Sequence, residues 1–273
     1  MAVIMTDDWL VSRSVFESRC HESGGDSSMG MACLFGKWWL RTDPNDESVC
    51  PHLIRDGYWE AWVSLAFARF VRPGMRVVDC GAHVGWYTLL ALARGADRVM
   101  AIEPQRDLGL MLRETLKDNG LSGRVDQWFG GVGARWGNAS LLRYGRLTGS
   151  ASFDRHAAEG WTPTDSVEVS VTPLDEVLMY SEWDQVDVVK IDVEGAEAEA
   201  WQGMAKTLSK NPLVLLEVGQ PRGYDLDALL RQIESEGYPL RVVTYEGGVL
   251  QVSRQWVLDN AKDLPSLWLR REA

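Results

Sequence analysis

The stretch MRVVDCGAHVG, residues 75–85, predicts a short apolar strand that turns at glycines into a helix. Gly81 and Gly85 at such a turn let a ligand approach the backbone, and the start of the helix offers free N–H groups. The next strand, RVMAIE, ends at Glu103, 22 residues after Gly81. Doubly wound nucleotide-binding folds place the acid that receives ribose hydroxyls at that position. Pro104 then turns the chain away from the strand.

Strands and helices alternate on both sides of this stretch. The alternation predicts an α/β fold with a doubly wound, mostly parallel seven-stranded sheet. The last two strands are separated by Glu246-Gly247, which indicates a hairpin, so we expect the last strand to run antiparallel. The seven expected strands span residues 75–80, 98–103, 124–129, 186–191, 212–218, 239–245 and 248–253.

Two segments interrupt the alternation. Residues 1–56 have little periodicity and many turn formers, so we expect an N-terminal cap or an irregular extension before a domain that spans residues 57–273. Residues 130–185 hold glycines, arginines and aromatic residues and a strand-like VEVSV. An insertion of this length predicts a substrate loop or a small subdomain rather than structureless chain.

Composition narrows the function classes. The chain has 273 residues and a formal net charge of −11, which would repel a phosphate backbone, so we expect no nucleic-acid partner. No apolar run approaches the ~20 residues that span a bilayer, and the N-terminus does not resemble a signal peptide. We therefore expect a cytoplasmic enzyme with no membrane partner. Its four cysteines form no C-x-x-C pair and are expected to be reduced thiols rather than zinc ligands.

The charge of the glycine turn distinguishes between two cofactors. The dinucleotide signature is G-x-G-x-x-G, whereas this turn is G-x-x-x-G with Asp79 at its head. An anionic side chain repels a pyrophosphate but attracts the α-ammonium of S-adenosylmethionine. The turn therefore favours S-adenosylmethionine over NAD. The alternative is that Gly81 and Gly85 only make a tight turn and that Glu103 is a solvated strand end.

A second stretch, KIDVEGAE (190–197), crowds Asp192, Glu194 and Glu197 into six positions. Mutual repulsion makes such crowding unfavourable unless a cation lies nearby. In an extended chain Lys190 and Asp192 point the same way, so Lys190 can offset one carboxylate. Glu197 falls in the first turn of a helix, where the dipole favours an acid. We expect the remaining cation to be a ligand, namely the sulfonium, the cofactor's ammonium, a divalent ion or a cationic substrate. Hydrogen bonds from loop N–H groups are the alternative.

The chain resembles the FkbM-type S-adenosylmethionine-dependent methyltransferases of the class I methyltransferase fold. The resemblance covers roughly residues 57–219 and includes VVDCGAHVGWYTLLA (77–91), AIEP (101–104) and VDVVKIDVEGAEAEAW (186–201). This chain departs from the family at His83, where Asn is usual, and after the third strand, where Gly131 replaces a polar contact to adenine. The residues expected to contact the cofactor are Asp79, Gly81, Ala82, His83, Gly85, Trp86, Glu103, Pro104, Gly131 and Asp192.

The resemblance implies methyl transfer, most often to a hydroxyl of a sugar or a natural product. The protein must then align the nucleophile and accept its proton. Asp192 is the first choice of base by position, and Glu194, His83 and His156 are the other candidates. The residues expected to hold the substrate are Glu194, Glu217, Trp136 and Arg155.

Other functions stay open at this point. The acids would also suit an N-methyltransferase that acts on an amine or guanidinium, and a non-catalytic scaffold would keep the fold without the reaction. Carboxylates and waters would suit Mg²⁺, although the resemblance does not require a metal. The expected partner is a small-molecule substrate. A homodimer would use the Trp-rich N-terminal segment.

Overall fold

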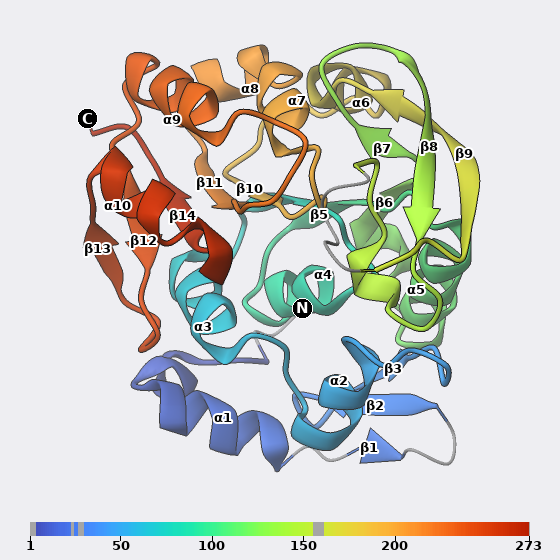
Figure 1. Ribbon diagram of the computed structural model, residues 1–273. Helices are drawn as coiled ribbons and strands as arrows, with labels where there is room; N and C mark the ends of the chain where they lie inside the picture. Colours follow the sequence, from blue (N-terminus) through green and yellow to red (C-terminus); the bar gives the residue numbers. More distant parts are fainter. Residues whose placement is uncertain (1–3, 23–24, 27–29, 155–160, 273) are drawn as a thin grey trace.

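The computed structural model describes residues 4–22, 25–26, 30–154 and 161–272, and a central sheet organises them (Figure 1). Eight strands form this sheet in the order β13-β12-β14-β11-β10-β4-β5-β6. In chain order they are β4 (Arg76–Cys80), β5 (Arg98–Ile102), β6 (Val125–Trp128), β10 (Val188–Ile191), β11 (Leu213–Glu217), β12 (Arg241–Val243), β13 (Val249–Gln251) and β14 (Ser266–Leu269).

The fold class is confirmed, although the sheet has one more strand than expected. Strands β6, β5, β4, β10 and β11 pair in parallel. β14 lies antiparallel between β11 and β12. The predicted hairpin is present as β12 and β13, but it forms the sheet edge, and the chain returns through α10 (Arg254–Asp259) to insert β14. The sequence SLWL at 266–269 is too short to stand out as a strand by pattern alone.

Alternating strand residues supply two cores, one on each face of the sheet. Val77 belongs to the first core and Val78 to the second, as the period of an extended chain requires. The first face carries α3 (Ala61–Phe70), α4 (Trp86–Ala93) and α5 (Arg106–Asp118). The second carries α6 (Leu174–Tyr180), α7 (Glu197–Gln202), α8 (Ala205–Ser209), α9 (Leu226–Ser235) and α10. In Figure 1 helices α6 to α9 lie above the sheet and α3 below it.

The N-terminal segment is regular where the structure describes it, which corrects the alternative of an irregular extension. It contains α1 (Arg13–His21), an antiparallel sheet of β1 (Gly25–Asp26), β2 (Met31–Leu34) and β3 (Trp38–Arg41), and α2 (Cys50–Asp56). Phe16, Leu34 and Leu53 are buried in the first core. β3 also docks on α5, where the Trp39 N–H donates to Asn119 Oδ1 at 3.0 Å. The segment therefore packs as a cap on the first face.

The insertion forms a second small sheet, separate from the central one. Its strands β7 (Gly131–Val132), β8 (Gly137–Arg143) and β9 (Asp165–Thr172) pair in the order β7-β9-β8. The expected VEVSV strand lies within β9. The short helix η4 (Thr148–Ser150) follows β8 and reaches the cap, where the Thr148 N–H donates to Asp46 Oδ1 at 3.1 Å. Among the described residues, no helix is long and apolar enough to cross a membrane.

Candidate active site

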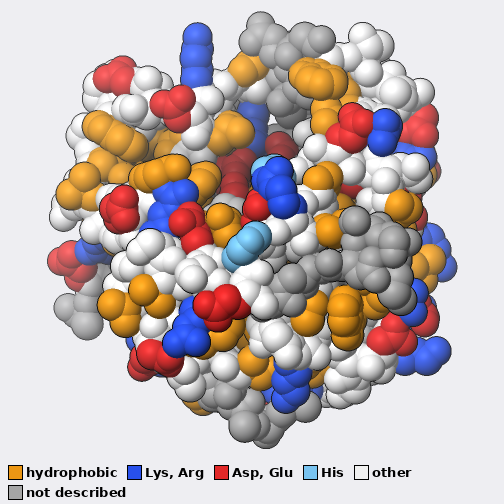
Figure 2. Space-filling view, turned by 90° about the horizontal axis from the view of Figure 1, so that it is seen from below, with side chains coloured by type: hydrophobic (Ala, Val, Ile, Leu, Met, Phe, Trp, Pro, Cys, Tyr) orange, Lys and Arg blue, Asp and Glu red, His pale blue; other side chains and the backbone are white. Residues whose placement is uncertain are grey.

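A cavity of about 250 Å³ lies where β4, β5, β10 and β11 end. The glycine turn, the KIDVEGAE segment, the cap and the insertion all contribute to its wall. Figure 2 shows acidic side chains deep in a hollow of the face that it displays. Ligands of doubly wound folds bind at this carboxyl edge, so the cavity is the candidate active site.

Four of the seven non-glycine residues with positive φ in the described chain line this cavity: Glu60, His83, Glu194 and Leu264. Their φ values lie between 44° and 52°. A side chain in this region costs free energy and persists where the surroundings fix it, which is common at functional sites. The backbone around the cavity is therefore held in uncommon conformations.

Two glycines of the turn allow close packing. Gly81 has φ +80°, and a Cβ there would lie 1.8 Å from the carbonyl oxygen of Asp192. Gly85 has φ +103°, and its Cβ would lie 2.3 Å from a Leu112 methyl carbon. Gly81 lines the cavity, whereas Gly85 packs against α5 behind it. The turn thus brings the two sequence motifs into direct contact.

Glu103 lies at the cavity wall as a preformed acceptor. Its carboxylate accepts the His83 N–H at 2.7 Å and the Gln105 N–H at 2.8 Å. Burial raises the pKa of Glu103 to about 7, although both N–H groups oppose that shift. The side chain is fixed by the backbone on two sides, as a receptor for two ribose hydroxyls needs to be.

Asp79 lies behind the cavity rather than on its wall. It is fully buried, accepts the Thr88 hydroxyl at 2.7 Å, and lies 4.0 Å from Lys190 Nζ. Its Oδ1 has no hydrogen-bond partner among the described residues. The structure therefore places Asp79 in the charge network under the site, and its contact with the cofactor's ammonium stays a prediction.

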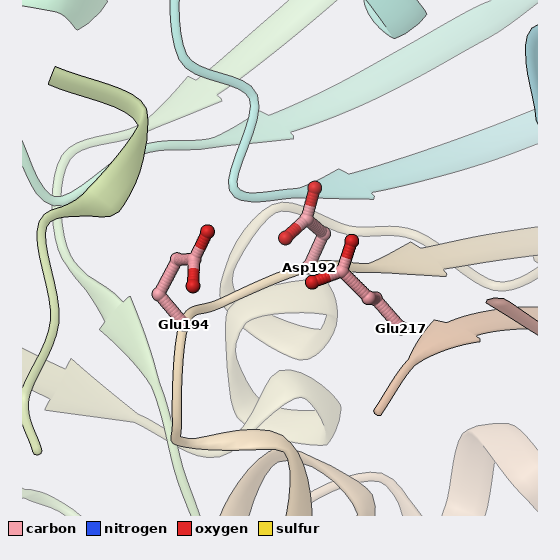
Figure 3. Close-up of side chains that lie close together, drawn as sticks. All are labelled: Asp192, Glu194 and Glu217. Atoms are coloured by element: carbon pink, nitrogen blue, oxygen red, sulfur yellow. The ribbon is translucent and has the colours of Figure 1, made fainter. Parts of the chain in front are cut away.

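The acid cluster contains three carboxylates from two neighbouring strand ends: Asp192, Glu194 and Glu217 (Figure 3). One oxygen from each lies within 4.8 Å of the others. Figure 3 shows Asp192 and Glu217 close together at the ends of their strands, with Glu194 beyond them on the loop.

Side chains of the protein supply most of the positive charge that the crowded carboxylates require. Arg222, which is 7% exposed, donates to Glu217 at 2.8 Å, to Glu194 at 3.1 Å and to the fully buried Glu197. Lys190 Nζ lies 3.1 Å from Asp192 Oδ2. The expectation that a ligand supplies the remaining cation is therefore corrected in part, because Arg222 bridges three of the acids.

Lys190 also connects the cluster to α4 and to Glu60, which directly precedes α3. Its ammonium lies 4.6 Å from the centre of the Tyr87 ring, and Tyr87 donates its hydroxyl to Glu60 at 3.2 Å. Burial alone would lower the pKa of Lys190, but the carboxylates of Asp192 and Asp79 hold it above its ordinary value. Lys190 is a fixed positive charge at the floor of the cavity.

Burial shifts several of these acids toward neutral pH. It raises the pKa of Glu60 to about 7, with repulsion from Asp192 as the second cause. It raises the pKa of Glu194 to about 8, against the attraction of Arg222. The pKa of Glu217 is well above its ordinary value for the same reason, with Asp192 and Glu194 adding to the shift. Carboxyls with such pKa values are effective proton acceptors near pH 7 to 8.

His83 is held in the turn by its backbone and by Thr148, whose Oγ1 lies 2.8 Å from Nε2. Burial lowers the pKa of His83 to about 4. A neutral imidazole with that pKa is a weak base at pH 7, which disfavours His83 as the proton acceptor. Its contact with Thr148 instead joins the glycine turn to the insertion.

The remaining predicted residues divide into three groups. Ala82, Trp86, Pro104 and Gly131 line the cavity. Trp136 is 51% exposed, donates to Glu176 and packs on Tyr180, away from the cavity. Arg155 and His156 lie outside the described residues.

Sequence reasoning missed Arg222, Glu60 and Gln105. Arg222 lies in an irregular loop after β11, and Glu60 directly precedes α3, so neither falls on a periodic face. The one signal for Arg222 was indirect, since the crowded acids required a cation. Gln105 follows Pro104 and donates its side-chain amide to the Thr148 carbonyl at 2.8 Å.

The acid cluster has the ligand type and spacing of a hard cation such as Mg²⁺, since carboxylate oxygens are its preferred protein ligands. However, Arg222 already bonds two of the three carboxylates and Lys190 the third. Each of these bonds uses one oxygen of its carboxylate, and the two cations offset part of the negative charge that a metal would otherwise neutralise. The three acids therefore do not need a metal to lie close together.

A family model described as the methyltransferase FkbM domain matches residues 79–240. The chain belongs to the FkbM methyltransferase family. It is a methyltransferase, and the family implies S-adenosylmethionine as the methyl donor. No curated protein sequence matches the chain.

Solved structures that resemble this FkbM methyltransferase are distant. A protein of the NADB-Rossmann superfamily from Streptococcus agalactiae is 13% identical with a TM-score of 0.42, over 76% of this chain and 67% of its own. A precorrin-6y C5,15-methyltransferase from Geobacter metallireducens is 14% identical with a TM-score of 0.42, over 83% and 93%. A putative rRNA methylase from Clostridium thermocellum is 12% identical with a TM-score of 0.45, over 77% and 93%. None of them indicates the methyl acceptor.

Proposed function

We propose that this protein transfers a methyl group from S-adenosylmethionine to a hydroxyl of a small molecule, such as a sugar or a natural product. The observation that carries the proposal is the pairing of the acid cluster. Arg222 and Lys190 already engage Asp192, Glu194 and Glu217. Each carboxylate of the cluster already has a cationic partner within the protein, which disfavours a cationic amine as the acceptor, whereas a carboxyl of raised pKa suits the removal of a hydroxyl proton.

The chain's own residues provide the cofactor end of the site. Glu103 receives the ribose hydroxyls, with its orientation fixed by the N–H groups of His83 and Gln105. Gly81 lets the cofactor approach the turn closely. When bound, S-adenosylmethionine supplies a methyl carbon activated by the sulfonium. The acids at the ends of β10 and β11 offset that positive charge at the edge where the acceptor approaches.

An N-methyltransferase is the second candidate, because one observation favours it. Glu60, Asp79 and Glu197 lie near the three acids of the cluster, which makes six acids in all. Only two cations, Lys190 and Arg222, lie among them in the described residues. If all were ionised, the excess of negative charge would attract an amine. The raised pKa values of Glu60 and Glu194 reduce that excess near pH 7, so a neutral acceptor is favoured.

The test supplies S-adenosylmethionine with three sets of acceptors: methyl glycosides, phenols and primary amines or guanidines. S-adenosylhomocysteine release and a 14 Da mass gain on the acceptor are measured together. Methylation of a hydroxyl compound supports the proposal. Methylation of amines alone contradicts it in favour of the second candidate. Binding of S-adenosylhomocysteine without turnover of any set would support a non-catalytic scaffold.

A further inference from the structure

A second cavity, of about 320 Å³, adjoins the first on the side of the insertion. It lies between the segment after β8, the loop after β11 and the short helix η5 (Ala261–Asp263). Three residues line both cavities: Ser150, Glu194 and Leu264. The other lining residues are Tyr144, Leu147, Trp161, Gln220, Pro221, Arg222 and Lys262.

One buried group in the second cavity has an unmet hydrogen bond. Tyr144 is 4% exposed, and its hydroxyl has no partner among the described residues. Leaving a buried hydroxyl unpaired costs free energy that a ligand hydroxyl would recover. Tyr144 therefore contributes to the cavity wall a side chain whose hydroxyl the described residues leave without a hydrogen bond.

The rest of the wall combines an aromatic surface with polar groups. Trp161 is 59% exposed and offers an indole face. The side-chain amide of Gln220 and the ammonium of Lys262 line the cavity and make no hydrogen bond or ion pair with a described residue, so both are available to a ligand. Aromatic stacking combined with hydroxyl and amide hydrogen bonds suits a polyhydroxylated ring better than a flat apolar one.

Glu194 is positioned at the junction of the two cavities. Its φ is +50°, and its carbonyl accepts the Ser152 hydroxyl, so the backbone is anchored in an uncommon conformation. Arg222 bonds Oε2, whereas no described residue donates to Oε1. One carboxylate oxygen is therefore fixed and the other is available between the two cavities.

We infer that the second cavity binds the methyl acceptor as a neutral sugar or glycoside, and that Glu194 rather than Asp192 is the catalytic base. This inference rests on the proposed function. The acceptor's hydroxyl oxygen forms the new O–C bond with the methyl carbon. The C–S bond breaks, and its electron pair stays on sulfur to give S-adenosylhomocysteine. The hydroxyl proton passes to Glu194 and from there to solvent.

Binding is tested first, with the methyl glycosides of glucose, galactose, xylose and rhamnose as probes and S-adenosylhomocysteine present. Ligand-observed NMR should detect at least one of them. Tyr144→Phe and Trp161→Ala should each weaken that glycoside by about tenfold and leave the Kd for S-adenosylhomocysteine within twofold. Tyr180→Phe and Trp256→Ala, exposed residues that line neither cavity, are the matched controls. Glycoside binding that is unchanged in both cavity variants overturns the inference.

The base is tested with Glu194→Gln and Glu199→Gln. The first should lower kcat at least 100-fold while glycoside and S-adenosylhomocysteine binding stay within about threefold. Glu199 is exposed on α7 and lines neither cavity, so its variant should keep kcat. A fully active Glu194→Gln overturns the role of Glu194. Methyl transfer to phenols or amines alone overturns the acceptor class, whereas failure of the wild type to bind S-adenosylhomocysteine would contradict the proposed function itself.

Discussion

Gly81 and Asp192 meet so closely that a single added carbon would disrupt the site. A Cβ on Gly81 would lie 1.8 Å from the Asp192 carbonyl oxygen, at a φ of +80°. The contact joins the turn after β4 to the end of β10, and their backbones already bond where the Asp192 N–H donates to the Cys80 carbonyl at 3.2 Å. The two motifs are therefore one structural unit.

Gly81→Ala should destabilise the protein and weaken the cofactor site together. The left-handed backbone and the steric clash should lower the free energy of unfolding by more than about 2 kcal/mol. Urea unfolding measures this, and calorimetry with S-adenosylhomocysteine measures binding. Gly137→Ala is the control, because its Cβ would meet nothing within 4 Å. Equal effects of the two substitutions would contradict the proposed contact.

The sequence predicts the fold well where side chains repeat with a regular period. Apolar strands flanked by helices identify β4, β5, β10 and β11, and the acid at the end of β5 identifies Glu103. β14 is not predicted because its four residues are too few to show a regular pattern. Arg222 is not predicted for a different reason. Its ion pairs depend on a loop that packs back onto α7 and β11. Such a contact between distant segments has no local signal in a single sequence.

Cofactor affinity should depend on pH through Glu103. Its pKa of about 7 means that the carboxylate takes a proton as the pH falls through 7 and loses acceptor capacity. We expect S-adenosylhomocysteine to bind up to about tenfold more weakly at pH 6 than at pH 8. Titration calorimetry across this range measures it.

The Glu103→Gln variant isolates this effect from other groups. It should bind S-adenosylhomocysteine at least about tenfold more weakly at pH 8 and lose most of the pH dependence. Glu60 also titrates near pH 7, so the difference between the variant and the wild type is the relevant quantity. Glu114→Gln, exposed on α5, should behave as the wild type. An unchanged pH profile in Glu103→Gln would rule out Glu103 as the titrating group.

Removal of divalent ions should leave the protein functional. Arg222 and Lys190 already pair with all three carboxylates of the acid cluster, so the acids do not require a metal to lie close together. We expect S-adenosylhomocysteine affinity and methyl transfer to be unchanged within about twofold in EDTA, a difference of ~0.4 kcal/mol. Calorimetry and turnover are measured with EDTA and again after addition of Mg²⁺. Activity that disappears in EDTA and returns with Mg²⁺ would show that a metal binds among the carboxylates.

Arg222→Met should be the most destabilising charge removal in the site. It leaves Glu194, Glu217 and the fully buried Glu197 without their shared cation, and loss of one partner from a buried ion pair costs about 3–5 kcal/mol. Because burial raises the pKa of all three acids, they can take up protons at low pH, so the loss should be smaller at pH 6 than at pH 9.

Urea unfolding of Arg222→Met at the two pH values measures this dependence, with Arg231→Met as the control. Arg231 is exposed and pairs with Asp227 one helical turn away, a contact worth less than about 1 kcal/mol. A loss in Arg222→Met that is equal at pH 6 and pH 9 would mean that the carboxyls do not change protonation when the arginine is removed. A loss no larger than that of Arg231→Met would mean that Arg222 is not the cation that holds the acid cluster together.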